Sequence, residues 1–206
     1  MHKIAQKCMA TGSAIAIGAA LWTTPAHAAT TWEVAPGGGF DWFAGLFNMR
    51  DEVTGTSLTC QSISASGTAK SDGGHPGESI ATLVDQTVNH CTGWLGITFG
   101  ATFSSPWSLN ANSYDASTDS VNGTISGIRF HFTTPGCSAD VAGPDATTPG
   151  TMSASYSNAL GELSLGGGNL HIWNVSGCFG LFASGHPWTI SMAPSIVDPP
   201  QVITAE

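Results

Sequence analysis

The chain has 206 residues, of which only 9% are charged, and its five basic residues are outnumbered by fourteen acidic ones, giving a formal net charge of −9 at pH 7. Affinity for nucleic acid comes chiefly from clustered Lys and Arg, so this charge balance argues against a nucleic-acid partner. A chain of this length can bury enough apolar surface to fold without a cofactor, and we expect none.

Residues 1–28 predict a secretory signal peptide. A basic start precedes an apolar stretch over residues 14–22, and the small-residue pattern Ala26-His27-Ala28 follows. The apolar stretch is shorter than the roughly 20 residues that a membrane-spanning helix needs. Cleavage after Ala28 would leave residues 29–206 as a single secreted β domain with three basic residues, no membrane span and a net charge of −11. We therefore expect an extracellular or loosely envelope-associated protein.

The remaining sequence predicts an all-β fold. Gly, Ser, Thr and Asn are abundant, and Pro or Gly interrupts segments in which apolar and polar residues alternate. The predicted strands, in chain order, are 31–35, 40–51, 56–63, 80–90, 95–103, 107–114, 121–132, 151–157, 163–165, 170–175, 188–192 and 201–204. The predicted breaks are 36–39, 71–74, 115–119, 147–150 and 166–168. Many short strands with tight turns predict an antiparallel sandwich or barrel.

The pattern within these segments indicates which strand faces are buried. Residues 107–112 and 128–132 alternate between apolar and polar side chains, as expected of strands with one face on a core and one in solvent. Residues 40–49 are instead apolar on both faces. Such a strand is either central in a sandwich or covered by another chain, and the first is the commoner case.

Two segments read as copies of one another. Residues 88–93 are followed by Pro106-Trp107, residues 175–180 are followed by Pro187-Trp188, and another cysteine precedes each copy. This pattern predicts two related half-repeats, approximately 56–133 and 134–206.

The four cysteines after residue 28 predict two disulfides, because their number is even and the compartment is oxidising. Three pairings are possible. The repeat favours Cys60 with Cys91 and Cys137 with Cys178, since each half would then hold its own bridge. A zinc site is the competing interpretation, but the sequence lacks the close Cys-x-x-Cys pair typical of one.

The tryptophans divide into anchors and candidates for binding. Trp107 and Trp188 each open a predicted strand, and we expect them to anchor the core rather than to stack on sugars. Trp94 lies between glycines in a loop-like context beside a predicted bridge and is the best candidate for an exposed ligand-binding aromatic. Trp42 and Trp173 complete the candidates, although core packing is the favoured interpretation for both.

The sequence predicts no catalytic or metal-binding residues. It contains no Gly-x-Ser-x-Gly motif and no phosphate-cradling loop, and every cysteine after residue 28 is assigned to a bridge. No two of the five histidines in that part of the chain have the spacing of metal ligands. Carboxylates are numerous, but spacing alone cannot identify a pair for glycoside cleavage.

At Leu58-Thr59-Cys60, Cys91-Thr92-Gly93, Pro106-Trp107, Gly136-Cys137 and Gly177-Cys178 the chain resembles a group of small secreted β-rich proteins common in actinobacteria. The resemblance covers nearly all of residues 29–206 and carries no established activity. More distantly, the order of four cysteines with a Pro-Trp between the second and third resembles the secreted activator of alkane oxidation of pseudomonads. That resemblance implies an extracellular factor acting at hydrocarbon or cell surfaces.

These observations favour a secreted, non-enzymatic β protein that acts at the cell envelope, in the extracellular matrix or on another surface. The alternatives are a carbohydrate-binding module that uses exposed aromatics and a secreted hydrolase with dispersed carboxylates. The expected partner is a surface, a glycan or a protein. A planar row of solvent-facing tryptophans would favour sugar binding, and a concave cleft with two close carboxylates would favour hydrolysis.

Overall fold

The computed structural model describes residues 30–206, and the predicted signal peptide lies outside them. The described chain is all-β, with two single-turn 3-10 helices, η1 and η2. Its elements are β1 (Trp32–Ala35), β2 (Gly38–Asp51), β3 (Ser57–Ala69), β4 (Asp72–His75), β5 (Ala81–Thr92), η1 (Trp94–Gly96), β6 (Gly100–Phe103), β7 (Trp107–Asp115), β8 (Ser120–Ile128), β9 (Phe130–Thr134), β10 (Cys137–Ala142), β11 (Gly150–Ser157), β12 (Glu162–Gly168), β13 (His171–Gly177), η2 (Cys178–Gly180), β14 (Trp188–Met192), β15 (Ser195–Asp198) and β16 (Val202–Ala205).

Eight antiparallel strands close into a barrel. Their order around the wall is β2, β15, β12, β11, β8, β7, β5 and β3, and the long pairing between β3 and β2 completes the ring. Closure leaves no unpaired edge where β2 and β3 meet, which protects a β protein from edge-to-edge association. The strand β14 pairs with β2 beyond the end of β15 and extends the wall at residues 47–51.

Small residues on β3 make room for aromatic rings inside the barrel. Ala65, Gly67 and Ala69 occupy alternate positions of β3 whose side chains point inward. A side chain at Gly67 would lie 2.1 Å from the ring of Phe40 on the neighbouring β2, so only glycine fits there. The alternation in the sequence thus fixes both the inward face and the close packing of these two strands.

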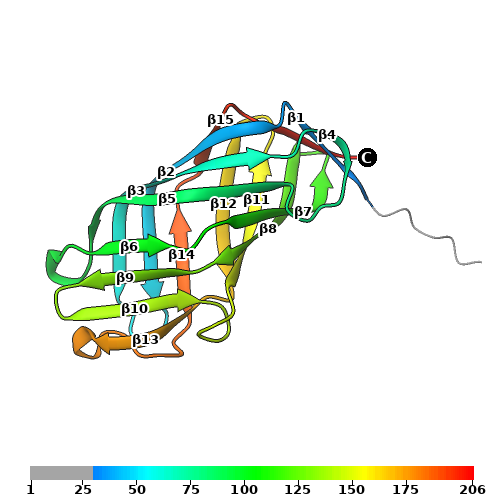
Figure 1. Ribbon diagram of the computed structural model, residues 1–206. Coiled ribbons are helices and arrows are strands. Elements are labelled where there is room, and N and C mark those ends of the chain that lie inside the picture. The colour runs from blue at the N-terminus through cyan, green and yellow to red at the C-terminus, as the bar shows by residue number, and fades with distance from the viewer. Residues whose placement is uncertain (1–29) are drawn as a thin grey trace, which may run out of the picture.

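A second sheet with the order β13, β10, β9 and β6 packs beside the barrel. Figure 1 shows these four strands stacked below the long strands β3 and β5, with the loops that follow β5 and β13 at the left of the view. Aromatic rings fill the layer beneath this sheet. The ring centroids of Phe132 and Trp188 are 5.9 Å apart in a stacked arrangement, and those of Phe103 and Trp107 are 5.6 Å apart, edge to face. Both Pro-Trp tryptophans are buried, which confirms them as core anchors.

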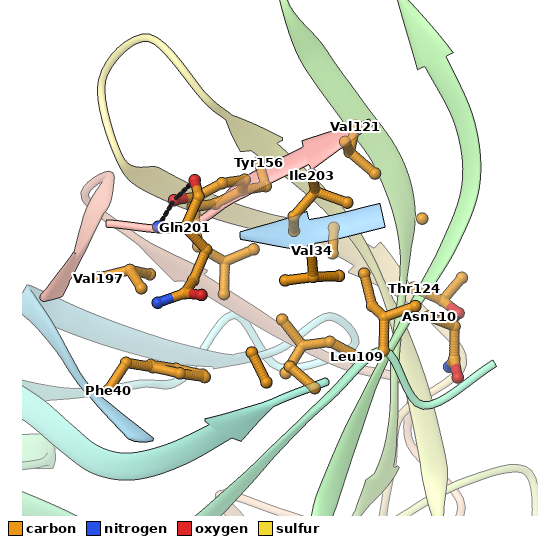
Figure 2. A pocket seen from close by; sticks show the side chains of 16 residues that line it. Val34, Phe40, Leu109, Asn110, Val121, Thr124, Tyr156, Val197, Gln201 and Ile203 are labelled. Carbon is orange, nitrogen blue, oxygen red and sulfur yellow. Dashed lines mark hydrogen bonds between the residues drawn. The ribbon is translucent and has the colours of Figure 1, made fainter. Parts of the chain in front are cut away.

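The short sheet β16, β1 and β4 covers the opposite end of the barrel. Beneath it lies a cavity of about 40 Å³ lined by apolar side chains that include Val34 and Ile203, and Figure 2 shows Tyr156 and Gln201 at its edge. The Tyr156 hydroxyl donates to the Gln201 carbonyl oxygen at 2.7 Å and accepts from the Gln201 backbone N–H at 2.9 Å. The space is no larger than a few water molecules, so this end of the barrel is a packed core rather than a ligand chamber.

Two disulfides join Cys60 to Cys91 and Cys137 to Cys178, as the sequence predicts. The first links β3 to β5 at directly opposed positions in the barrel wall. The second links the start of β10 to η2, in the second sheet. The first bridge therefore lies three residues before η1, and the second includes the first residue of η2.

A further turn is held by a single carboxylate. In the connection between β10 and β11, Asp145 accepts hydrogen bonds from the hydroxyls of Thr147 and Thr148, both at 2.7 Å, and from their backbone N–H groups, both at 2.8 Å. These four donors favour the ionised form and hold the pKa of Asp145 well below its usual range.

Most of the predicted strands are confirmed. The predicted strand 121–132 is two strands, β8 and β9, which separate at Arg129 and belong to different sheets. The sequence does not predict β10 or β15, and two predicted breaks are wrong, because 71–74 contains most of β4 and 166–168 continues β12. The predicted strand 95–103 begins within η1, and only its end forms a strand, β6. The segment 40–49 is not buried on both faces: Phe43 and Leu46 on β2 are half-exposed on the outside of the barrel.

Candidate functional site

Two turns of the same backbone form stand at one end of the molecule. In η1, Leu95 adopts φ 55° and ψ 22°, and in η2, Phe179 adopts φ 52° and ψ 28°. Each turn reads Gly, then one residue, then the bulky left-handed residue, then Gly: Gly-Trp-Leu-Gly at 93–96 and Gly-Cys-Phe-Gly at 177–180. Large side chains are rare in left-handed backbone, which costs about 1–3 kcal/mol at a non-glycine residue.

The surrounding structure holds each turn in place. Beside η1, the backbone N–H of Gly93 donates to the carbonyl oxygen of Ile97 at 2.8 Å, which closes the loop between β5 and β6. Beside η2, the N–H of Cys178 donates to the carbonyl oxygen of Gly136 at 3.0 Å, and a side chain at Gly177 would lie 2.1 Å from that same oxygen. Since a disulfide anchors each loop as well, the left-handed residues are fixed by their neighbours and not by their own preference.

The two turns share one exposed apolar surface, which we call the apolar tip and define as Trp94, Leu95, Ile97 and Phe179. Their exposed fractions are 47%, 76%, 37% and 77% respectively. Below the tip lies a cavity of about 40 Å³ to which both turns contribute, since its lining includes Trp94, Ile97 and Phe179. The cavity is too small for an organic ligand, so what the tip offers is its outer surface.

The aromatic core supports the tip from below. Phe132 lines the cavity and packs against Phe99 at 6.4 Å and Phe182 at 5.7 Å, and these rings connect to the stacked Trp188. A contiguous apolar layer thus runs from the barrel wall to the tip. The exposed side chains are the solvent-facing end of that layer rather than isolated surface residues.

The tip is also uncharged. Within residues 30–206, no charged side chain lines the cavity or belongs to the tip, although this part of the chain carries fourteen acidic and three basic residues. The nearby link to the barrel carries charge: the Thr54 hydroxyl donates to the Leu181 carbonyl oxygen at 2.8 Å, and beside the adjacent Gly55 lies the Arg50 guanidinium, 4.0 Å from Glu52. A charged partner would therefore find no counter-charge among the tip residues themselves.

Of the three candidate aromatics, only Trp94 belongs to this surface. Trp42 is fully buried, and its indole N–H donates to the Ser195 hydroxyl at 2.6 Å inside the barrel, so it cannot bind a ligand at the surface. Trp173 is partly buried, donates to the Gly143 carbonyl oxygen at 3.1 Å, lies on β13 of the second sheet and is not among the residues that line the cavity below the tip. The structure therefore does not bring the three together into a row.

Three larger clefts in the described region carry different chemistry. A cleft of about 430 Å³ opens where β5 and β6 diverge and holds one carboxylate, Asp85, and one histidine, His90, beside two phenylalanines. A shallow groove of about 510 Å³ on the outside of β7, β8, β11 and β12 is lined by Ser, Asn, Gly, Ala and Leu. A cleft of about 340 Å³ where β9, β10 and β13 meet is lined by Thr, Ser, Gly and Cys. None of these three clefts contains two carboxylates or a tryptophan.

Two histidines bind aspartates outside the tip. His131 and Asp140 are joined at 2.7 Å on the exposed face of the second sheet, and Asn174 donates to the other carboxylate oxygen at 2.7 Å. Partial burial raises the pKa of Asp140, but these hydrogen bonds outweigh it and leave that pKa below its usual range. His186 contacts the buried Asp51 at 2.8 Å. Residues 30–206 contain no group of three or more His, Cys, Asp or Glu arranged to hold a metal ion.

The sequence does not predict three of the four tip residues. Leu95 and Ile97 lie in the predicted strand 95–103, and Phe179 follows a cysteine of a predicted bridge. The common Gly-x-bulky-Gly pattern at 93–96 and 177–180 is the signal that could have found them.

No protein-family model, curated protein or solved structure matches this chain. Across residues 30–206, the structure contains no helix long and apolar enough to cross a membrane.

Proposed function

We propose that this chain is a secreted, non-enzymatic β protein that attaches to the cell envelope or another extracellular surface through the apolar tip. The single observation that carries the proposal is the tip itself: four large apolar side chains from two disulfide-anchored turns, gathered at one end of the molecule. Contiguous exposed apolar surface of this kind marks an interaction site in a soluble protein.

Backbone conformation supports the same proposal. Leu95 and Phe179 occupy left-handed positions where glycine or asparagine would fit more easily, yet both are large, apolar and more than three-quarters exposed. Neither side chain gains much burial from being there. Strain that yields no packing is typical of functional positions, because selection for binding offsets its cost.

Two disulfides are consistent with the oxidising environment of a secreted protein. Mass spectrometry of culture supernatant tests this part of the proposal: we expect a chain that begins at Ala29. Recovery only of full-length chain in the membrane fraction would contradict secretion.

Attachment is tested by sedimentation with washed envelopes of the producing cells. Protein purified from the culture medium is compared with the double variant Leu95→Asn, Phe179→Asn, which keeps the left-handed turns but replaces their apolar side chains. The matched control is Leu160→Asn, a 69% exposed leucine in the turn between β11 and β12. We expect the double variant alone to stay in the supernatant. Equal sedimentation of all three proteins would refute attachment through the tip.

Carbohydrate binding remains a second candidate because Trp94 is half-exposed. A stacking site would need neighbouring hydrogen-bond donors and acceptors to orient a sugar, whereas the other three tip side chains are aliphatic or phenyl. If this candidate holds, the wild-type protein should bind particular glycans on a glycan array, and the variant Trp94→Ala should not bind them.

A further inference from the structure

We infer that the surface bound by the apolar tip is an uncharged lipid bilayer, into whose interfacial region Leu95 and Phe179 insert. This inference rests on the proposed function and names the partner of the same site.

The area of the tip leaves both a protein and a lipid possible as partners. With about 200 Å² for a fully exposed large apolar residue, the exposed fractions of the four tip residues amount to roughly 500 Å². Stable protein complexes bury about 800 Å² on each partner, of which just over half is apolar. Charge argues against a second copy, because two chains of net charge −11 would repel one another, whereas a few inserted side chains suffice for reversible interfacial binding.

Charge selects the kind of lipid. The tip and the cavity beneath it are uncharged among the described residues, and the same part of the chain has a net charge of −11. Peripheral proteins that bind anionic lipid use clustered Lys or Arg, which this surface lacks. Zwitterionic headgroups impose no such repulsion, so the charge distribution favours a neutral bilayer.

The shape of the tip suits insertion. Leu95 and Phe179 are the most exposed of its residues and stand on turns, while Trp94 is half-exposed and lines the cavity together with Phe179. Tryptophan is enriched at the level of the lipid headgroups, with aliphatic and phenyl side chains favoured deeper. The two most exposed side chains are therefore of the kind that inserts, and the less exposed Trp94 is of the kind found at the headgroup level.

The test uses flotation of phosphatidylcholine vesicles with protein purified from the culture medium. If half of the exposed area of each side chain inserts, Leu95→Asn and Phe179→Asn should each lower the partition coefficient by about 20-fold at roughly 25 cal/mol per Å². The control Leu160→Asn should leave it unchanged. Adding phosphatidylglycerol to the vesicles should weaken binding of the wild-type protein, because the protein is acidic.

The outcomes separate this inference from the proposed function. Sedimentation with envelopes but no flotation with phosphatidylcholine would overturn the lipid partner and leave attachment through the tip intact. Stronger binding to phosphatidylglycerol vesicles would overturn the neutral bilayer. A dimer in sedimentation velocity that Phe179→Asn dissociates would identify a second copy as the occupant and overturn the inference as well.

Discussion

Replacing Leu95 by asparagine should stabilise the fold, even though it removes a large apolar side chain. Leu95 has φ 55° and is 76% exposed. A denatured chain already buries about 10–40% of its extended-chain surface, so folding withdraws almost none of this side chain from water. The hydrophobic loss is therefore close to zero.

The gain comes from the backbone. A bulky residue in left-handed conformation costs about 1–3 kcal/mol, and asparagine adopts this region more readily. We expect Leu95→Asn to raise the free energy of unfolding by about 0.5–1 kcal/mol, or by about 1–4 °C in Tm for a chain of this size. Phe179→Asn, at φ 52° and 77% exposed, should behave alike.

Urea unfolding followed by circular dichroism measures both variants against Leu160→Asn. Leu160 is similarly exposed but is not among the residues with positive φ, so its replacement should change stability by less than about 0.5 kcal/mol. A loss of more than 0.5 kcal/mol in Leu95→Asn, relative to that control, would show that the side chain contributes packing. The left-handed backbone at Leu95 would then cost less than the packing of its side chain gains. Gain in stability together with loss of vesicle binding is the combination expected of residues selected for binding.

Three further predictions concern the core and one surface turn. Trp107→Ala should cost about 3–5 kcal/mol in urea unfolding and Trp94→Ala less than about 1, and equal losses would place Trp94 in the core. Ser195→Ala leaves the buried indole N–H of Trp42 without its acceptor and should cost about 1–3 kcal/mol, whereas an unchanged midpoint would contradict that hydrogen bond's role. The low pKa of Asp145 stabilises the fold above the ordinary carboxyl pKa and ceases to do so as pH falls through its folded value. Asp145→Asn should therefore be less stable than wild type at pH 7, and urea midpoints measured down the pH scale should converge; a constant difference would refute this.

The sequence predicts the fold class well because alternation and turn residues are local signals. Both disulfides are also as predicted, on the expectation that each predicted half-repeat holds its own bridge. Alternation does not report which sheet a strand joins, however, and residues 121–132 alternate across the point at Arg129 where β8 leaves the barrel and β9 enters the second sheet. β15 has only four residues, too few for a pattern, whereas β10 alternates apolar and polar residues over 137–141, a signal that could have predicted it.

The site was predictable only in part. Trp94 could be identified because flanking glycines offer little bulk to bury it. Leu95 and Phe179 could not, because their exposure depends on left-handed turns, which are unusual for such residues. The two turns η1 and η2 come together only where the loops after β5 and β13 meet, and these loops are far apart in the sequence.

The position of Trp94 in a bilayer tests the account most directly. Vesicles of phosphatidylcholine that is brominated near the headgroup end of its acyl chains quench tryptophans that reach the boundary between headgroups and acyl chains, and the variant Trp94→Phe identifies the contribution of this residue. We predict that vesicle binding quenches the Trp94 emission, and that the emission remaining in Trp94→Phe, which comes largely from buried tryptophans, stays constant. Vesicle-bound protein whose Trp94 emission is unquenched would contradict attachment through the apolar tip.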